Sequence, residues 1–584
     1  MVLLFALKLF VSSLKPLPTD CWWDGWPISS SLILSRIGRR LRELVQLCAR
    51  RGYLCVNSPQ SDLGSNLNET YAMVPLLMLI SLVAATLIWI LSTVVKNLLV
   101  VRELQRKLPT FKTIPAVPVL GSTLLFKNDR GPSDIFATFT NFHRQYGNDI
   151  IAQTLFNAPA LQITSAKVVE QVLHARTIKK SIIYEFMRPW LKEGLVTSLG
   201  KKWAQRRRII TPAFHFKILE EFLGIFKERS EVFVDKLKDQ VNKGDFNIYE
   251  HVTLCTLDII SESAMGVKLN AQDDPNSSYV QAVKEMSDII FRRLFSALRD
   301  YKIFFLMSQA AQRQREALKI LHKFTDSVIL QRKAQLDDEK SKQVTQQKME
   351  ETDIYGKRKM TLLELLLNVS VEGHALTNSD IREEVDTFMF AGHDTTTSCI
   401  SFSAYHIARN PEIQQKLYDE MVQIIGADFK NAELTYSALQ ELKYLEMTIK
   451  EVLRIHPSVP IIGRKSAGDM TIDGQLVPAG VDIAVMIYAM HRNPDVFPEP
   501  DKFDPERFNE ENNAKRHAYS YIPFSAGARN CVGQKYALLE IKATLVKLLG
   551  HYRLLACDSE NEVKIKSDMT LRPVNGTFLK IVAR

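Results

Sequence analysis

The chain has 584 residues, more than one hydrophobic core usually serves, and its apolar (46%) and charged (24%) fractions are those of a globular protein. The net charge of +10 is modest for this length, and no compact basic module with interleaved aromatic residues accompanies it, which argues against a nucleic-acid partner. The seven cysteines are scattered, odd in number and free of C-x-x-C pairs, so neither a disulfide framework nor a structural zinc site is expected.

The first clear element is the uncharged segment 74–95, VPLLMLISLVAATLIWILSTVV. A helix of this length spans about 33 Å, close to the thickness of a bilayer core. Basic residues such as Lys96 and Arg102 follow it, whereas the stretch before it carries Asp62 and Glu69. The positive-inside rule therefore predicts a transmembrane anchor with the C-terminal body in the cytosol. A buried core helix is the alternative, although soluble helices rarely lack charge on every side.

Two further segments flank this anchor. Residues 1–72 show no connection with the rest of the sequence, and we expect the functional chain to start at Met73. The alternative is that the basic segment 35–51, SRIGRRLRELVQLCARR, lies as an amphipathic helix on a membrane. Residues 96–121 are basic and rich in proline, which is typical of a semi-rigid spacer, and we expect 122–584 to form the main domain.

Helical patterns predominate from about residue 120, so the main domain is expected to be mainly α with a small β region. The longest helix is predicted at 379–410, with Asp380 and Glu383 as a capping box at its start and Pro411 beyond its end. A second helix is predicted at 444–456, YLEMTIKEVLRIH.

The remaining segments contain turns and a polar run. Asp473 and Gly474 predict a hairpin turn, and residues 478–480 predict a second turn. Residues 335–360 are charged and nearly free of aromatic side chains, so we expect a solvated loop there.

A single cysteine near the C-terminus carries the strongest chemical signal. In PFSAGARNCVGQ, Cys531 directly precedes a strong helix, where the helix dipole and free N–H groups favour a thiolate, and the nearby Arg529 adds positive charge. A buried structural thiol is the alternative for any cysteine taken alone. One thiolate binds a soft metal only if that metal brings its other ligands, as haem iron does.

The pattern Phe524-x-x-Gly527-x-Arg529-x-Cys531-x-Gly533 resembles the haem-binding loop of the cytochrome P-450 family. The resemblance implies the cytochrome P-450 fold and a haem b cofactor, with Cys531 as the axial ligand of the iron. It also implies that the two glycines let the backbone follow the ring and donate N–H groups to the sulfur. Phe524 would pack beside the sulfur, and Arg529 would reach a haem propionate.

Three more residues match propionate contacts of this family. Trp203 and Arg207 in WAQRR have the W-x-x-x-R spacing, and Arg464 matches a third contact. A W-x-x-x-R pattern alone is weak, and a basic surface helix is its alternative.

Glu451 and Arg454 in EVLR, with Arg507 in FDPERF, resemble the buried Glu–Arg–Arg cluster of the family, which is structural rather than catalytic.

The stretch AGHDTTT places poor helix formers in the middle of the long helix, which predicts a kink or bulge. It resembles the oxygen-binding groove of the family, which implies that Thr395 contacts dioxygen and that Asp394 helps to deliver protons. One residue departs from the pattern of family four: Ala391 replaces a glutamate that can form an ester with a haem methyl group. We therefore expect the haem to be held without a covalent bond to the ring.

The stretches LDIISESAMG and EVDTFMF look like family four, whose members mostly hydroxylate fatty acids or related lipids near the chain end. We therefore expect a monooxygenase of the endoplasmic reticulum membrane that inserts one oxygen atom from O2 into a lipophilic substrate. Its electrons would come from NADPH through NADPH–cytochrome P-450 reductase, with cytochrome b5 as an optional second donor.

Three alternatives remain open. The same chemistry could act on xenobiotics, hormones or cuticular lipids. A haem-thiolate isomerase or dehydratase would need no reductase, and a haem-binding sensor would have no turnover. Thr395 and Asp394 argue against the last two, because oxygen activation uses them.

Overall fold

The computed structural model describes residues 66–107, 111–116, 121–126, 131–147, 149–155, 158–175, 178–296, 302–347, 360–371, 373–429, 432–557 and 563–584. The chain divides into two compact units, Met1–Val95 and Lys96–Arg584. The predicted extension falls outside the described residues up to residue 65, and so does the basic segment 35–51.

Helix α3 (Asn66–Lys107) contains the predicted anchor at 74–95. Most of the large apolar side chains described in it are exposed, among them Met78, Leu82, Leu87 and Leu91. Within the described ranges, no helix combines the length and the apolar character that crossing a membrane requires. The transmembrane part of the predicted fold is therefore not confirmed.

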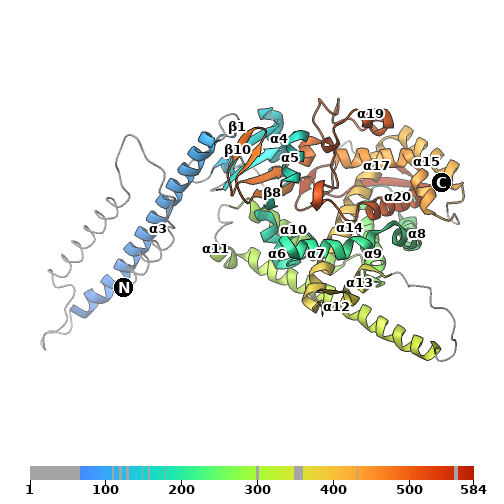
Figure 1. Cartoon of the computed structure of the whole chain (residues 1–584), viewed down its shortest axis with the longest axis horizontal. Coiled ribbons are helices and arrows are strands. Elements are labelled where there is room, and N and C mark those ends of the chain that lie inside the picture. The colour runs from blue at the N-terminus through green and yellow to red at the C-terminus, as the bar shows by residue number, and fades with distance from the viewer. Residues whose placement is uncertain are drawn as a thin grey trace. The chain divides into compact units, whose positions relative to one another are not determined.

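The second unit is mainly helical with short strands, which confirms the predicted fold class (Figure 1). Helix α14 (Asn378–Arg409) runs through its core and packs against α9 (Ile248–Met265), α20 (Gln534–His551) and α17 (Lys443–Ile455). The remaining helices of this unit are α4 (Pro132–Tyr146), α5 (Ala166–His174), α6 (Ile182–Leu191), α7 (Gly200–Ile210), α8 (Phe216–Leu237), α10 (Ser278–Leu294), α11 (Lys302–Leu306), α12 (Gln309–Gln347), α13 (Leu362–Asn368), α15 (Pro411–Ile425), α16 (Tyr436–Glu441), α18 (Ile487–Met490) and α19 (Glu510–Ala514).

The capping box at the start of α14 lies three residues before the predicted one, although the helix begins only one residue before the predicted start. Thr377 is the N-cap, and its side chain accepts from the N–H of Asp380 while the Asp380 carboxylate accepts from the N–H of Thr377. The capping box is therefore Thr377 with Asp380. Glu383 instead accepts a hydrogen bond from Lys202 of α7 at 2.7 Å, so its side chain is used in packing between helices.

The prediction of a loop at 335–360 is wrong for its first half, because α12 continues to Gln347. The residues there are mostly Gln, Lys, Asp and Glu, and most of these extend an existing helix at little cost although they form no apolar periodic pattern. Figure 1 shows this end of α12 projecting away from the helices around its other end. Residues 348–359 lie outside the described ranges.

The largest sheet has six short strands in the order β1-β2-β3-β11-β8-β4. These strands are β1 (Lys112–Thr113), β2 (Ile150–Leu155), β3 (Ala158–Ile163), β11 (Asp482–Val485), β8 (Ile462–Ser466) and β4 (Ile178–Lys180). The pairs β1–β2 and β11–β3 are parallel and the others antiparallel. Strands that are distant in sequence thus meet in one layer, and β4 brings its residues beside β8 at the sheet edge.

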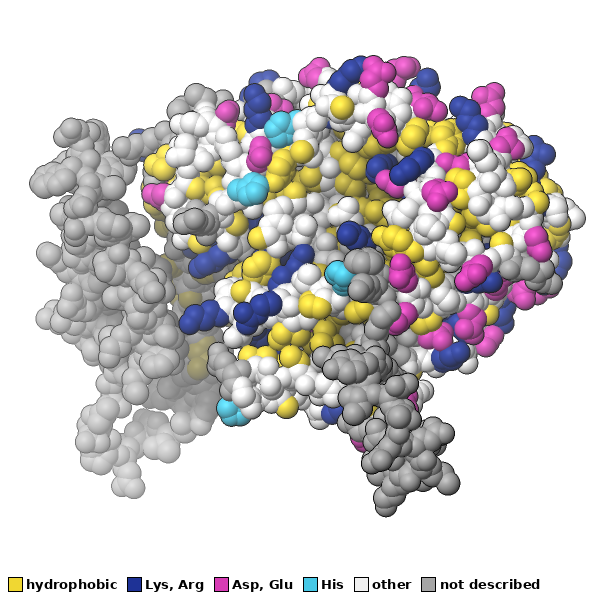
Figure 2. Space-filling model, turned by 45° about the vertical axis from the view of Figure 1, so that its right-hand side comes forward, with side chains coloured by type: hydrophobic (Ala, Val, Ile, Leu, Met, Phe, Trp, Pro, Cys, Tyr) yellow, Lys and Arg dark blue, Asp and Glu magenta, His cyan; other side chains and the backbone are white. Residues whose placement is uncertain are grey.

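The small sheets include the predicted hairpin. Strands β9 (Met470–Ile472) and β10 (Gln475–Val477) are joined by Asp473 and Gly474, both with positive φ, as a tight hairpin turn requires. The other small sheets are formed by β12 (Tyr552–Leu555) with β15 (Phe578–Ala583) and β5 (Phe246–Asn247), by β13 (Ile565–Ser567) with β14 (Leu571–Pro573), and by β6 (Ser370–Val371) with β7 (His374–Ala375). On the face shown in Figure 2, acidic and basic side chains are interspersed over much of the surface, in keeping with the modest net charge.

Candidate active site

The loop that contains Cys531 folds back on itself before α20. The N–H of Cys531 donates to the carbonyl oxygen of Phe524 at 2.9 Å, which closes the loop. Helix α20 begins at Gln534 with Gly533 as its N-cap, so Cys531 stands just before a helix N-terminus as predicted. The fold therefore presents one thiol at the end where free N–H groups and the helix dipole favour negative charge.

The two glycines of this loop serve different purposes. Gly527 has φ near +69°, and a Cβ there would lie 2.9 Å from the carbonyl oxygen of Leu173, so both conformation and space require glycine. Gly533 has an ordinary φ, and a Cβ there would meet only the Phe214 ring at 3.7 Å. What Gly533 contributes is its peptide N–H, which hydrogen-bonds the Cys531 sulfur.

The thiol of Cys531 is accessible, although protein atoms surround it on most sides. Burial raises its pKa, and the Gly533 N–H and the charge of Arg207 offset this only in part. The Arg529 guanidinium lies 3.8 Å from the ring centre of Trp203 and donates to the carbonyl oxygen of Ser198, so that it stands on the α7 side of the loop. The protein alone thus favours the thiol, and a metal cation on the sulfur would be needed to hold the thiolate.

Three cationic side chains lie beside this loop, Arg207, Arg464 and Arg529, and together they are called the cation wall. Arg207 of α7 donates to the carbonyl and to the side-chain oxygen of Asn530, both at 2.7 Å, and so fixes the residue before Cys531. Arg464 of β8 is buried and donates to the carbonyl of Gly463. Burial, with the neighbouring Arg464 and Arg207, lowers the pKa of Arg529 to about 10.

The described part of the chain places few acidic side chains near this cation wall. In the described part of the chain, Arg207, Arg464 and Arg529 have no carboxylate partner within 4 Å. Arg464 is buried and the other two are half-buried, and such cations are stabilised by a nearby anion, which no described carboxylate supplies here. A single accessible thiol and several uncompensated cations form a donor set that fits a haem, whose iron takes one protein ligand and whose edge carries two carboxylates.

The middle of α14 has one face that is less buried than the rest. Ala391 and Thr395, one turn apart, are half-buried, and the Thr395 hydroxyl donates to the Ala391 carbonyl at 2.8 Å. A Cβ on Gly392 would lie 2.5 Å from Cγ1 of Ile260, so this glycine allows α9 and α14 to approach. The predicted bulge is not found, because α14 is α-helical from Asn378 to Arg409.

Asp394 is adjacent to Thr395 in sequence but its side chain is bonded elsewhere. Its carboxylate accepts two hydrogen bonds of 2.8 Å from Arg572 of β14 and a short one from Thr570. Although burial alone would raise the pKa of Asp394, the charge of Arg572 and these hydrogen bonds lower it overall. The structure therefore does not bring the side chains of the two predicted catalytic residues together.

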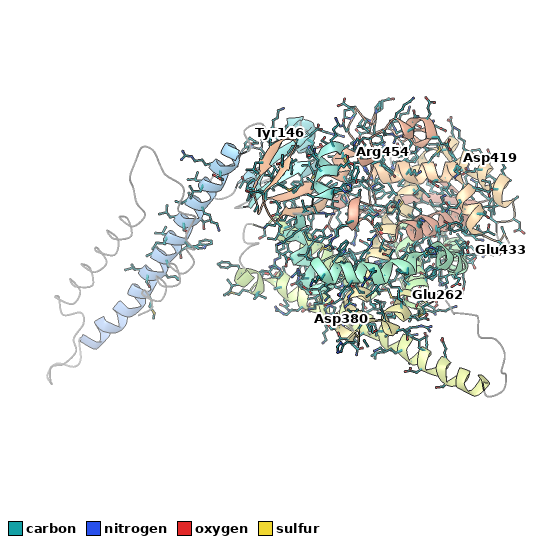
Figure 3. All side chains as sticks on the ribbon, in the orientation of Figure 1. Tyr146, Glu262, Asp380, Asp419, Glu433 and Arg454 are labelled. Atoms are coloured by element: carbon teal, nitrogen blue, oxygen red, sulfur yellow. The ribbon has the colours of Figure 1, made fainter. Side chains whose placement is uncertain are left out.

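The predicted Glu–Arg–Arg cluster is confirmed. The buried Glu451 accepts from Arg454 at 2.7 and 2.9 Å, and Nε of Arg507 lies 3.5 Å from its carboxylate. Arg454, labelled on α17 in Figure 3, also donates to the carbonyls of His491, Pro500 and Lys502. The cluster thus ties α17 to the segment that leads into the Cys531 loop, which is a structural role.

Sequence reasoning missed three residues of this region. Asn530 looked like a spacer within the loop motif, and Arg572 lies 178 residues after the aspartate that it binds. Lys180 of β4 stands opposite Arg464 in the sheet. No motif joins such residues, and only the strand pairing and the hydrogen bonds reveal them.

Comparisons with known proteins agree with this geometry. A family model described as Cytochrome P450 matches residues 112–581. The chain is 42% identical over 473 residues to "Cytochrome P450 4d2" of Drosophila melanogaster, covering 80% of this chain and 93% of that protein. It is 39% identical over 509 residues to "Cytochrome P450 4V2" of Pongo abelii, covering 86% and 95%. With its cysteine loop, cation wall and long central helix, the chain belongs to the cytochrome P450 family and is a haem-thiolate monooxygenase.

Proposed function

We propose that this enzyme hydroxylates fatty acids or related aliphatic lipids, using O2 and electrons from NADPH. The electrons would arrive through NADPH–cytochrome P-450 reductase, with cytochrome b5 as an optional second donor. The observation that carries the proposal is the closed loop that presents Cys531 before α20, next to cations that have no carboxylate partner among the described residues. The lipid substrate class rests on the resemblance of the sequence to family four, whose names the relatives bear.

The cofactor that fits is haem b, held by the residues around the loop. Cys531 would bind the iron, and Phe524, Gly527 and Gly533 would shape the loop against the ring. Trp203, Arg207, Arg464 and Arg529 would hold its two carboxylates. When bound, the haem supplies the oxygen activation, which the thiolate ligand assists.

Thr395 and Asp394 would donate and relay protons at the half-buried face of α14. The Thr395 hydroxyl can turn from the Ala391 carbonyl toward the half-buried face of the helix and offer its proton there. Asp394 can pass a proton toward the groove only when its carboxylate leaves Arg572, because that pair holds it ionised. With this pair formed, Asp394 fixes α14 against β14.

Attachment to the membrane of the endoplasmic reticulum is part of the proposal. Two sets of exposed apolar side chains support it. One lies along α3 and includes Met78, Leu82 and Leu91, and the other lies at α11 and includes Ile303 and Met307. Large exposed apolar groups of this kind mark surfaces that contact lipid or protein.

The axial ligand is tested with carbon monoxide and ferrous iron. Wild-type protein should show the strongly red-shifted Soret band of a thiolate ligand, and Cys531→His should lose it while retaining haem. Cys557→Ser is the matched control, because that free cysteine lies outside the loop. A Cys531→His protein that keeps the red-shifted band would remove the assignment.

Turnover separates the alternative functions. Fatty-acid hydroxylation should require both NADPH and the reductase, whereas an isomerase or dehydratase would work without them and a sensor would form no product.

Acidic organic solvent should extract all the haem from wild-type protein, because Ala391 has no carboxylate to form an ester with the ring. Haem that travels with the denatured polypeptide would contradict the non-covalent attachment.

A further inference from the structure

Arg293, in the last turn of α10, is held between two aromatic rings. Its guanidinium carbon lies 4.5 Å from the ring centre of Phe186 of α6 and 4.0 Å from the ring centre of Phe305 of α11. The Arg293 side chain is half-buried, and its Nε atom is fully buried and has no hydrogen-bond acceptor. The rings attract the cation, but they offer no oxygen to its N–H groups.

The protein supplies no anion for this cation. In the part of the chain that the structure describes, no carboxylate lies within 4 Å of the Arg293 guanidinium, and burial lowers its pKa. The neighbouring arginines differ: Arg292 binds Asp288 at 2.7 Å, and Arg313 of α12 binds Glu285 at 3.1 Å. Arg293 is therefore the arginine of this region whose N–H groups remain available to an anion from outside the protein.

Helix α6 connects this cation with the half-buried face of α14. Phe186 and Trp190 are four residues apart in α6, so they lie on the same face of that helix. The buried Trp190 has its ring centre 4.8 Å from that of Phe390 in α14. Phe390 directly precedes Ala391, which shares the half-buried face with Thr395. An apolar face of α6 thus leads from the cation to the part of α14 where oxygen insertion is proposed.

We propose that Arg293 is a substrate-binding residue whose guanidinium binds the carboxylate of a long-chain fatty acid. The hydrocarbon chain would follow the Phe186 face of α6 toward Thr395. A guanidinium presents its N–H donors as a planar fork that matches a carboxylate, and the two rings beside it exclude water from the pair. This inference rests on the proposed function, and it adds a residue that holds the polar end of the substrate.

The test measures how tightly the haem-loaded protein binds dodecanoic acid and its methyl ester, followed by the change in haem absorbance. Arg293→Met should bind the acid on the order of tenfold more weakly than wild type, as expected for a lost hydrogen bond to a charged group. Arg293→Lys should recover part of the affinity, because it keeps the charge but not the fork. Arg292→Met is the matched control and should bind as wild type does, because Arg292 is exposed and already paired with Asp288.

The methyl ester, which has no charge, separates recognition of the carboxylate from damage to the fold. Wild type and Arg293→Met should bind the ester with equal affinity. Equal affinity of the two proteins for the acid would overturn the proposal, and so would an equal loss of affinity for acid and ester in Arg293→Met. If Arg293→Met does not accumulate, Arg293→Gln provides the same comparison.

The headgroup of an anionic phospholipid is the competing anion. A variant that loses affinity for phosphatidylserine vesicles but binds dodecanoic acid as wild type does would assign Arg293 to the lipid surface and overturn the proposal. A wild type that binds neither the acid nor the ester would refute the lipid substrate class as well. A wild type that binds both, with Arg293→Met unchanged, would remove Arg293 alone and leave the proposed function intact.

Discussion

At the scale of residues, the ion pair of Asp394 and Arg572 is the strongest single connection between α14 and β14. Both side chains are buried, and the guanidinium binds the carboxylate with two hydrogen bonds of 2.8 Å. Removal of one partner leaves the other charge buried without compensation, which costs about 3–5 kcal/mol. Replacement of both by apolar residues is often nearly neutral.

We therefore expect Asp394→Leu to lower the midpoint of thermal unfolding by many degrees, and Asp394→Leu with Arg572→Leu to recover most of it. The pKa of Asp394 is lowered in the folded protein, so its contribution is present above the unfolded pKa, about 4, and is lost as pH falls through the folded value. The advantage of wild type over the double variant should thus shrink in acid. A single variant as stable as wild type at pH 7 would contradict this account.

Local patterns predict some residues of the site but not others. Cys531 and the Glu451–Arg454 pair could be found because a loop motif and a helical spacing of three bring their neighbours together. Arg572 and Lys180 could not be found, because their partners are distant in sequence and lie beside them only through strand pairing. The contacts of Arg529 could not be predicted for a similar reason: Trp203 and Ser198, which position it, come from the region of α7.

At the scale of elements, the approach of α9 to α14 depends on one glycine. A methyl group on Gly392 would lie 2.5 Å from Cγ1 of Ile260, too close for either helix to keep its place. Overpacking of this kind typically costs about 1–3 kcal/mol. Gly224 in α8 has nothing within 4 Å of its ideal Cβ, so it is the matched control within a helix.

We expect Gly392→Ala to lower the unfolding midpoint, and Ile260→Ala to reverse part of that loss when the two are combined. Gly224→Ala should raise the midpoint slightly, because alanine is the better helix former by about 1 kcal/mol. The measurement is thermal unfolding followed by circular dichroism. If Gly392→Ala is as stable as Gly224→Ala, the close contact between the helices is not a constraint.

The elements that the sequence predicted correctly are those with a strong local signal. The helices α14, α17 and α20 have long periodic patterns, and the β9–β10 hairpin has Asp473-Gly474 at its turn. The six-stranded sheet was not predicted, since its strands span two to six residues and pair with distant segments. The polar half of α12 was misjudged because its sequence has no apolar periodic pattern, and only its helix propensity identifies it.

At the scale of the whole molecule, the order of motifs predicted the family correctly. The family model extends over residues 112–581, which contain the loop, the cation wall and the central helix. The boundary near Val95 separates this part from the preceding unit. Motifs identify chemistry within a folded body, but they do not say how that body is oriented at a membrane, which depends on charges around an apolar segment.

The charges that flank 74–95 predict a cytosolic body, and this orientation has a direct test. A tag at the C-terminus should be lost when protease is added to intact microsomes without detergent, because Lys96 and the basic residues after it favour the cytosolic side. A tag fused directly before Met73 should survive until detergent opens the vesicles. As a control, replacing Lys96, Arg102, Arg106 and Lys107 with glutamine should weaken this preference and protect a fraction of the C-terminal tag. Protection of the C-terminal tag in wild type would mean that the body lies in the lumen, where the proposed reductase could not deliver electrons from cytosolic NADPH.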